Sequence, residues 1–155
     1  MASLRELYVQ QCAALGLAKP NSSVRDLLPS KASRNASLTE LDLRQNVVGP
    51  KGLQTLLPVI RAAEGLQTLR LNNNHLTNDS VEELVAALQK HPGIARLDLS
   101  DNKITTPAGK ELLALAKRNR NVTEIVTRGT VIRPLMTNCI GFQLEKNLRQ
   151  KQAAG

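Results

Sequence analysis

The stretch LTELDLRQNVV at residues 38–48 decides the fold, because variants of it return along the chain at a fixed interval. LQTLRLNNNHL stands at 66–76 and IARLDLSDNKI at 94–104, so the three starting positions 38, 66 and 94 are evenly spaced. In the first segment, alternation with a period of two places Leu41 and Leu43 on one side of a short strand. The residues between them then face the opposite side. Each segment therefore predicts one strand of a repeating unit.

The second half of each unit changes to a helical period. Gly52, Leu56 and Ile60 lie four residues apart, and the same spacing returns at the equivalent positions of the next two units. This spacing is typical of one apolar stripe along a helix. A single strand–helix unit cannot bury its apolar residues, whereas stacked units can. The pattern therefore predicts parallel strands in one layer and helices in another.

The three segments resemble the LxxLxLxxNxL signature of leucine-rich repeats. The 28-residue length and the helical half resemble the ribonuclease-inhibitor-like class, and the resemblance spans residues 38–148. It implies an α/β fold: a right-handed solenoid with parallel strands on the concave face and helices on the convex face. An asparagine after each strand can bond backbone groups of the bend, and in the resembled family these residues form a structural ladder. The ladder positions here are Asn46, Asn74 and Asn102.

The chain divides into a helical N-terminal cap at 1–37, three repeats at 38–121, and a degenerate C-terminal capping repeat with a basic tail at 122–155. Within the cap we expect two helices, followed by a loop over residues 30–37. Pro58 predicts a kink or a late start in the first repeat helix. The spacing of apolar, Gly and Pro residues in the cap resembles N-terminal segments of some cytoskeletal and ciliary leucine-rich-repeat proteins. This resemblance implies an association with the cytoskeleton or the cilium.

Composition limits the possible functions. The chain has 155 residues, the length of one domain, and Tyr8 and Phe142 are its only aromatic residues. So few aromatic rings argue against a base-stacking platform for single-stranded RNA. The chain has no long apolar run, which predicts no membrane span, and its start does not read as a signal peptide. Cys12 and Cys139 are too far apart in sequence to indicate a disulfide framework, so we expect two small buried hydrophobes and a cytoplasmic location.

The residues that alternate with the buried leucines should form three rows across the concave face. The middle row alternates in charge, so we expect lateral ion pairs that link Asp42, Arg70 and Asp98. These pairs are either local charge compensation or part of a polar binding surface, and both can hold together. The candidate partner-binding residues are Glu40, Asp42, Arg44, Thr68, Arg70, Asn72, Arg96, Asp98, Ser100, Glu124 and Arg128.

Positive charge gathers in the C-terminal third. The net charge is +8, yet residues 1–109 hold 12 basic and 10 acidic side chains, whereas residues 110–155 hold 9 basic and 3 acidic. This excess is either a solvated helix face or a surface for an acidic polymer, such as RNA or an acidic protein tail like that of tubulin. The candidate basic patch consists of Lys117, Arg118, Arg120, Arg133, Lys146 and Arg149.

No catalytic motif stands in the sequence. His75 and His91 lie in different repeats and form no pair, and we expect no cofactor and no metal site. The sequence therefore predicts a non-catalytic protein–protein interaction module, a small scaffold or adaptor that binds its partner through the concave face or an end of the solenoid. The alternative is that the basic third binds an acidic polymer. Self-association through a solenoid end is a third hypothesis, and the oligomeric state stays open.

Overall fold

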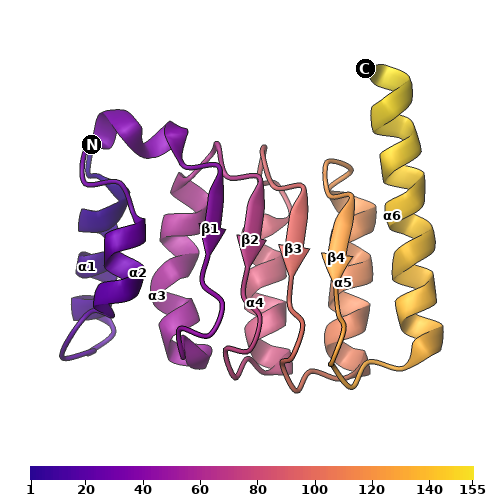
Figure 1. Cartoon of the computed structure of the whole chain (residues 1–155), viewed down its shortest axis with the longest axis horizontal. Helices are drawn as coiled ribbons and strands as arrows, with labels where there is room; N and C mark the ends of the chain where they lie inside the picture. The colour runs from indigo at the N-terminus through magenta and orange to yellow at the C-terminus, as the bar shows by residue number, and fades with distance from the viewer.

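A computed structural model describes all 155 residues of the chain. Four short strands form one parallel sheet in the order β1-β2-β3-β4, and a helix follows each strand (Figure 1). The strands are β1 (Glu40–Asp42), β2 (Thr68–Arg70), β3 (Arg96–Asp98) and β4 (Glu124–Val126). The helices that follow them are α3 (Gly49–Ala62), α4 (Asn78–Leu88), α5 (Thr106–Arg118) and α6 (Pro134–Ala154). The N-terminal region holds α1 (Leu4–Ala14), α2 (Ser22–Leu27) and the 3-10 helix η1 (Ala32–Ser37).

Residues that pair between neighbouring strands are one repeat length apart in the sequence throughout the sheet. The register joins Glu40 to Thr68, Thr68 to Arg96, and Arg96 to Glu124, so each residue pairs with the equivalent position of the next repeat. The helices form a second layer on one face of the sheet, and the strand–helix–strand crossovers are right-handed (Figure 1). The opposite face of the sheet carries no covering element. The predicted α/β solenoid is therefore confirmed.

One aliphatic core runs the length of the stack. It contains 34 buried apolar residues, most of them leucines. Leu41, Leu69 and Leu97 are in register across β1 to β3 and are almost fully buried. Because every unit presents the same leucines at the same level, each coil closes the apolar side of the coil before it. Tyr8, in the N-terminal region, is the one aromatic residue in this core.

The first repeat helix begins earlier than Pro58 predicted. α3 starts at Gly49, which has a φ of +66°, and Pro50 occupies its first turn. Proline fits there because the first turn has no intrahelical partner for its missing N–H. Pro58 lies within the assigned helix, so the predicted late start is wrong. The helix instead continues to Ala62, one turn past Pro58.

The N-terminal region packs on the first repeat, with α1 lying against α3 (Figure 1). A capping box starts α1, in which Ser3 accepts a hydrogen bond from the backbone of Glu6 and the Glu6 carboxylate accepts one from the backbone of Ser3. The predicted loop at residues 30–37 is wrong over most of its length, because η1 forms at Ala32–Ser37. The buried Asn35 side chain explains this turn, because it bonds the backbone of both Leu4 and Ala2.

Tyr8 gives a spectroscopic test of this packing. Burial raises the pKa of its phenol to about 12, against a smaller opposing effect of the hydrogen bond that the phenol oxygen accepts from the Asn21 backbone. Because Tyr8 is the chain's only tyrosine and there is no tryptophan, tyrosinate absorbance reports this residue alone. We expect a titration midpoint well above the ordinary value of 10.0.

The same shift predicts how stability depends on pH. The folded pKa is raised, so the stabilisation is complete below the unfolded pKa and is lost as pH rises through the window between the two values. The free energy of unfolding, measured with urea, should therefore decline from about pH 10 toward pH 12. A midpoint near 10.0 in a chain that keeps its far-ultraviolet circular dichroism would contradict the buried position of Tyr8.

The two cysteines differ in environment. Cys12 is buried in α1, as expected, whereas Cys139 is exposed on α6, so the prediction of two buried thiols is wrong for Cys139. The apolar spacing around Cys139 reflects residues on both sides of α6, and only one side has a neighbour. None of the helices combines the length and the hydrophobicity that a membrane-spanning segment requires.

Candidate functional site

The concave face brings the predicted surface residues together in rows. Glu40, Thr68, Arg96 and Glu124 are in direct register across the four strands. The row of Asp42, Arg70, Asp98 and Val126 lies two residues further along each strand. Backbone hydrogen bonds continue past the strand ends and align the third row, which consists of Arg44, Asn72, Ser100 and Arg128. The sheet therefore holds these side chains about 4.8 Å apart from strand to strand.

Arg70 is at the centre of the ion pairs on this face. Its Nε lies 3.1 Å from Glu40 Oε1 on β1, and its Nη1 lies 4.0 Å from Asp98 Oδ2 on β3. Arg96 reaches Glu124 on the next strand, with Nε 3.4 Å from Oε2. Charges of opposite sign thus meet across each strand boundary from β1 to β4. The pairs with Glu40 and Glu124 are exposed, and the half-buried Arg70–Asp98 pair is long, so each contributes little to the free energy of folding.

Asp42 does not form the predicted ion pair with Arg70. It pairs instead with Arg44 two residues further along the chain, with Arg44 Nη2 2.8 Å from Asp42 Oδ2. Partial burial raises the pKa of Asp42, but the hydrogen bonds and charge of Arg44 outweigh this and hold the pKa below its usual range. The prediction failed because Arg44 leaves the strand at its end and can turn back on Asp42, whereas Arg70 is held toward Glu40 and Asp98.

Two residues of the face are more enclosed than their rows predict. Ser100 is buried and donates to Asp98 Oδ1 at 2.6 Å, and its backbone N–H donates to the same oxygen at 3.0 Å. Thr68 is also buried, although it belongs to the outermost row. Both are small side chains. The exposed part of the face is therefore formed mainly by arginine and carboxylate side chains.

The asparagines after the strands differ in how they are bonded. Asn102 is buried: its Oδ1 accepts from the backbone N–H groups of Asn74 and Leu76, and its Nδ2 donates to three backbone carbonyls. The Nδ2 of Asn74 donates to the Leu43 and Asn72 carbonyls, and its Oδ1 accepts from Val48. Asn46 is at the end of the row, and its side chain bonds only the Arg44 carbonyl. The ladder thus connects adjacent repeats at Asn74 and Asn102 but has no preceding strand to reach from Asn46.

A second set of polar side chains connects the repeats at the opposite corner, where each helix ends. The His91 Nε2 lies 3.1 Å from the Ile60 carbonyl and 2.9 Å from the Ala63 carbonyl of the preceding repeat. Asn119 makes the equivalent bonds to the Leu88 and His91 carbonyls. Asn147, which lies within α6, donates hydrogen bonds to the carbonyls of Ala116 and Val122. Three of the carbonyls, those of Ile60, Leu88 and Ala116, lie in the last turns of α3, α4 and α5, where carbonyls have no partner within the helix.

This corner was not anticipated, although a signal for it stood in the sequence. His91, Asn119 and Asn147 occupy the same position of successive repeats, and Asn35 falls on the same series two steps earlier. A search for recurring polar residues, in addition to recurring leucines, would have found them. His91 has no histidine partner, but it has equivalents in Asn119 and Asn147.

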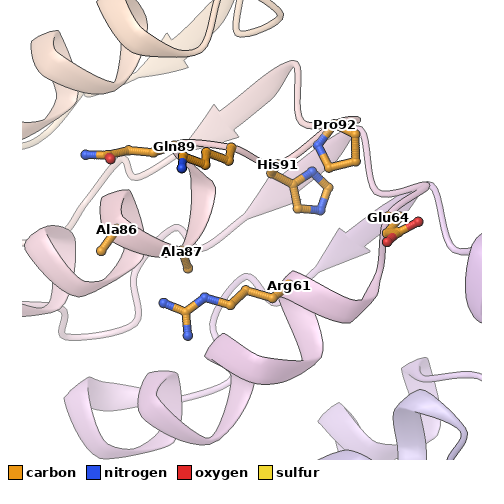
Figure 2. A pocket seen from close by; sticks show the side chains of 8 residues that line it. Arg61, Glu64, Ala86, Ala87, Gln89, His91 and Pro92 are labelled. Carbon is orange, nitrogen blue, oxygen red and sulfur yellow. The ribbon is translucent and has the colours of Figure 1, made fainter. Parts of the chain in front are cut away.

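His91 also lines a pocket of about 390 Å³ between α3 and α4 (Figure 2). Arg61, Glu64 and Lys90 contribute charged side chains to its rim. The His91 Nδ1 accepts hydrogen bonds from the backbone N–H groups of Gly93 and Ile94, and Nε2 faces the two carbonyls described above. Both ring nitrogens are therefore engaged with the backbone. The ring fixes the turn between α4 and β3 and has no free nitrogen to offer a ligand in this pocket.

The predicted basic patch is divided in the structure. Lys117, Arg118 and Arg120 at the end of α5 lie beside the C-terminal half of α6, because Arg120 donates to the Gln150 side chain and Lys151 to the Asn121 carbonyl. Lys146 and Arg149 belong to that half of α6. Arg133 precedes the other end of α6, about 20 Å from Lys146 by helix rise. Five of the six predicted residues therefore share one end of the helical layer, and Arg133 is separate.

Two family models described as leucine-rich repeat match the chain. One matches residues 34–57 and 95–113, and the other matches residues 65–86, so the matches fall on the first three strand–helix units. The fold is a leucine-rich-repeat solenoid. The matches stop before β4, where Thr127 and Thr130 replace the third leucine and the asparagine of the signature.

A solved structure described as leiomodin-1 actin-binding site 2 has a similar fold. It matches with a TM-score of 0.61 and covers 79% of this chain and 91% of its own. The sequence identity is 12%, so the similarity is one of fold. A search of curated protein sequences finds no match. The leucine-rich-repeat solenoid seen here is thus shared with a protein whose description is that of a binding site.

Proposed function

We propose that this protein is a protein-interaction module that binds its partner through the concave face of the solenoid. The observation that carries the proposal is the face of the sheet that no helix covers (Figure 1). Four basic and four acidic side chains stand on this face in regular rows. The buried leucines stabilise the stack without them, and exposed ion pairs add little stability. A surface with ordered charges of both signs instead favours one partner over others and guides its approach.

The chemistry of the face limits the partner. Glu40, Asp42, Asp98 and Glu124 balance Arg44, Arg70, Arg96 and Arg128, so the surface has no net charge. A highly charged partner gains little from such a surface. A partner with a mixed row of acidic and basic residues can replace the lateral ion pairs one by one. The repeat length and the helical convex layer also support placing these units in the ribonuclease-inhibitor-like class.

The leiomodin-1 structure suggests where to begin the search. Its description as an actin-binding site makes actin the first protein to test, and a role at the cytoskeleton follows if actin binds. The comparisons offer no support for a role at the cilium. The proposal itself concerns the surface and does not depend on actin being the partner.

The experiment is co-sedimentation or affinity capture with the wild-type chain and with the double variant Arg70→Glu, Arg96→Glu. These changes place like charges beside Glu40, Asp98 and Glu124, so we expect partner affinity to fall about tenfold or more. Arg61→Glu is the matched control, because Arg61 is an exposed arginine on the convex side in α3. Circular dichroism should show that all variants are folded. Affinity of the double variant within about twofold of wild type would reject the concave face.

A second candidate function rests on Lys117, Arg118 and Arg120 at the end of α5, together with Lys146 and Arg149 on the C-terminal half of α6. Among these five residues one ion pair forms, between Arg149 and Glu145, and the positive charges of the others are not compensated by an ion pair. An acidic polymer such as RNA or a tubulin-like tail would bind there with a steep salt dependence. The same assay separates the two: loss of binding in the variant Lys117→Gln, Arg118→Gln, Arg120→Gln, with Arg70→Glu, Arg96→Glu unaffected, would favour the acidic polymer.

A further inference from the structure

α6 is the last helix of the convex layer, and only one of its sides has a neighbouring helix (Figure 1). α3, α4 and α5 each lie between two other helices, whereas α5 is the one helix on which α6 packs. Ile140, Leu144 and Asn147 mark the side of α6 that is buried against the stack. The opposite side is where the next helix of a longer solenoid would lie.

The outward side of α6 carries a continuous stripe of side chains. Successive residues turn by about 100° around a helix, which places this set within a strip about 80° wide. Leu135 is 78% exposed and Phe142 is 73% exposed, and Val131 just before the helix is 62% exposed. The set, called the outer stripe below, consists of Leu135, Cys139, Phe142, Lys146 and Arg149.

The outer stripe is not the surface expected at a free end of a solenoid. Terminal units normally present a polar outer face, because nothing covers them. Here the first half of the stripe is apolar, and it holds the chain's only phenylalanine in an exposed position. Aromatic residues at such positions are enriched at the centres of protein interfaces.

We propose that the outer stripe docks an amphipathic helix of another protein. The apolar side chains of that helix cover Leu135, Cys139 and Phe142, and its acidic side chains lie against Lys146 and Arg149. The bound helix takes the place of the next helix in the convex layer. This docking site is separate from the concave face and does not depend on the function proposed for that face.

The stripe runs straight along one side of α6, which suits a helical partner that packs along it. Its members follow one another at intervals of four, three, four and three, which average three and a half positions. That average is the period of the contact line between two packed helices. A strand, with its period of two, would meet only scattered members of the stripe. A helix meets them all.

The charge of the stripe and its surroundings indicates the sign of the charge on the partner helix. Residues 131–155 contain four basic side chains and one acidic side chain, and that acid, Glu145, is already paired with Arg149 at 2.6 Å. A second copy of this chain does not match the stripe. Parallel copies would place Lys146 beside Lys146, and antiparallel copies centred on Phe142 would place Arg149 against Leu135. An acidic partner helix avoids both conflicts.

The test uses two synthetic helical peptides with the length of α6, 21 residues. Each has leucines at alternating intervals of four and three in one half. In the other half, the same positions hold glutamate in one peptide and lysine in its pair. Fluorescence anisotropy with the full chain should show the glutamate peptide binding about tenfold or more tightly than the lysine peptide.

Variants locate the binding on α6. Phe142→Ala should weaken the glutamate peptide about tenfold, as expected of an interface anchor. Lys146→Glu with Arg149→Glu should reverse the preference between the two peptides. Leu27→Ala is the control, because Leu27 is 44% exposed on α2 at the far end of the solenoid. It should leave both affinities unchanged.

Cys139 supplies a second readout that needs no substitution. It is the exposed cysteine and lies within the stripe, whereas Cys12 is buried. The bound glutamate peptide should slow alkylation of Cys139. Equal affinity for the two peptides, or Phe142→Ala within about twofold of wild type, would overturn the proposal. A dimer in sedimentation that Phe142→Ala dissociates would also overturn it, since the occupant would then be a second copy.

Discussion

Asn102→Ala is expected to reduce the free energy of unfolding by about 3 kcal/mol, because each buried backbone group left without a partner costs about 1–3 kcal/mol. The Asn102 Oδ1 accepts from Asn74 and Leu76 at 3.1 and 3.0 Å, and Nδ2 lies within 3.2 Å of the carbonyl oxygens of Leu71, Leu99 and Ser100. These groups belong to two adjacent repeats. Alanine removes every one of these bonds, and the buried site leaves little access for water to replace them.

Asn46→Ala is the matched control for this prediction. Asn46 occupies the equivalent position in the first repeat, but its side chain makes one hydrogen bond, to the Arg44 carbonyl at 3.0 Å. The side chain is partly exposed, so water can take over this bond, and we expect a loss of less than about 1 kcal/mol. Urea denaturation followed by circular dichroism measures both variants. Equal losses would show that the position, and not the bonding between repeats, sets the cost.

Leu97→Ala is expected to cost about 2–5 kcal/mol, the usual penalty for emptying a buried leucine site. Leu97 is 1% exposed and lies in register between Leu69 on β2 and Ile125 on β4. Its side chain belongs to the core shared by successive repeats, so the neighbouring side chains cannot collapse into the space without moving a whole coil. The resulting cavity sits at the junction of two repeats.

Leu135→Ala changes the same residue type at an exposed position on α6. Leu135 packs on no covering element, so we expect a stability change within about 0.5 kcal/mol. Both variants are compared with wild type in the same urea series. A change below about 0.5 kcal/mol for Leu97→Ala would contradict its place in the core.

Local periodicity predicts the parts of this fold that depend on one face being buried. Leu41 and Leu43 alternate, and Gly52, Leu56 and Ile60 recur at every fourth position, because strands and helices each have a fixed period. The constant repeat length then aligns the units. Side chains that leave this periodic frame are harder to place. Arg44 stands past the end of β1, and its turn back to Asp42 depends on the bend there.

The candidate site divides in the same way. The sequence was sufficient to assign Glu40, Arg70 and Arg96 to the uncovered side of the strands, because alternate residues of a strand must face opposite sides. It was not sufficient to separate Arg133 from the rest of the basic patch. That separation depends on which end of α6 each residue occupies and on where α5 ends. Separation along the sequence predicts neither of these two features.

By itself, then, the amino-acid sequence determined the strand–helix repeat and the burial of its leucines, since a repeating apolar pattern has one efficient way to exclude water. The tertiary structure alone decided which polar groups meet: the bonds of His91, Asn119 and Asn147 across repeats, the partners of Arg70, and the exposure of Phe142 on α6. These depend on what lies beside each residue in space. The outer side of α6 is exposed because a helix packs on only one of its sides, and no local pattern encodes which side that is.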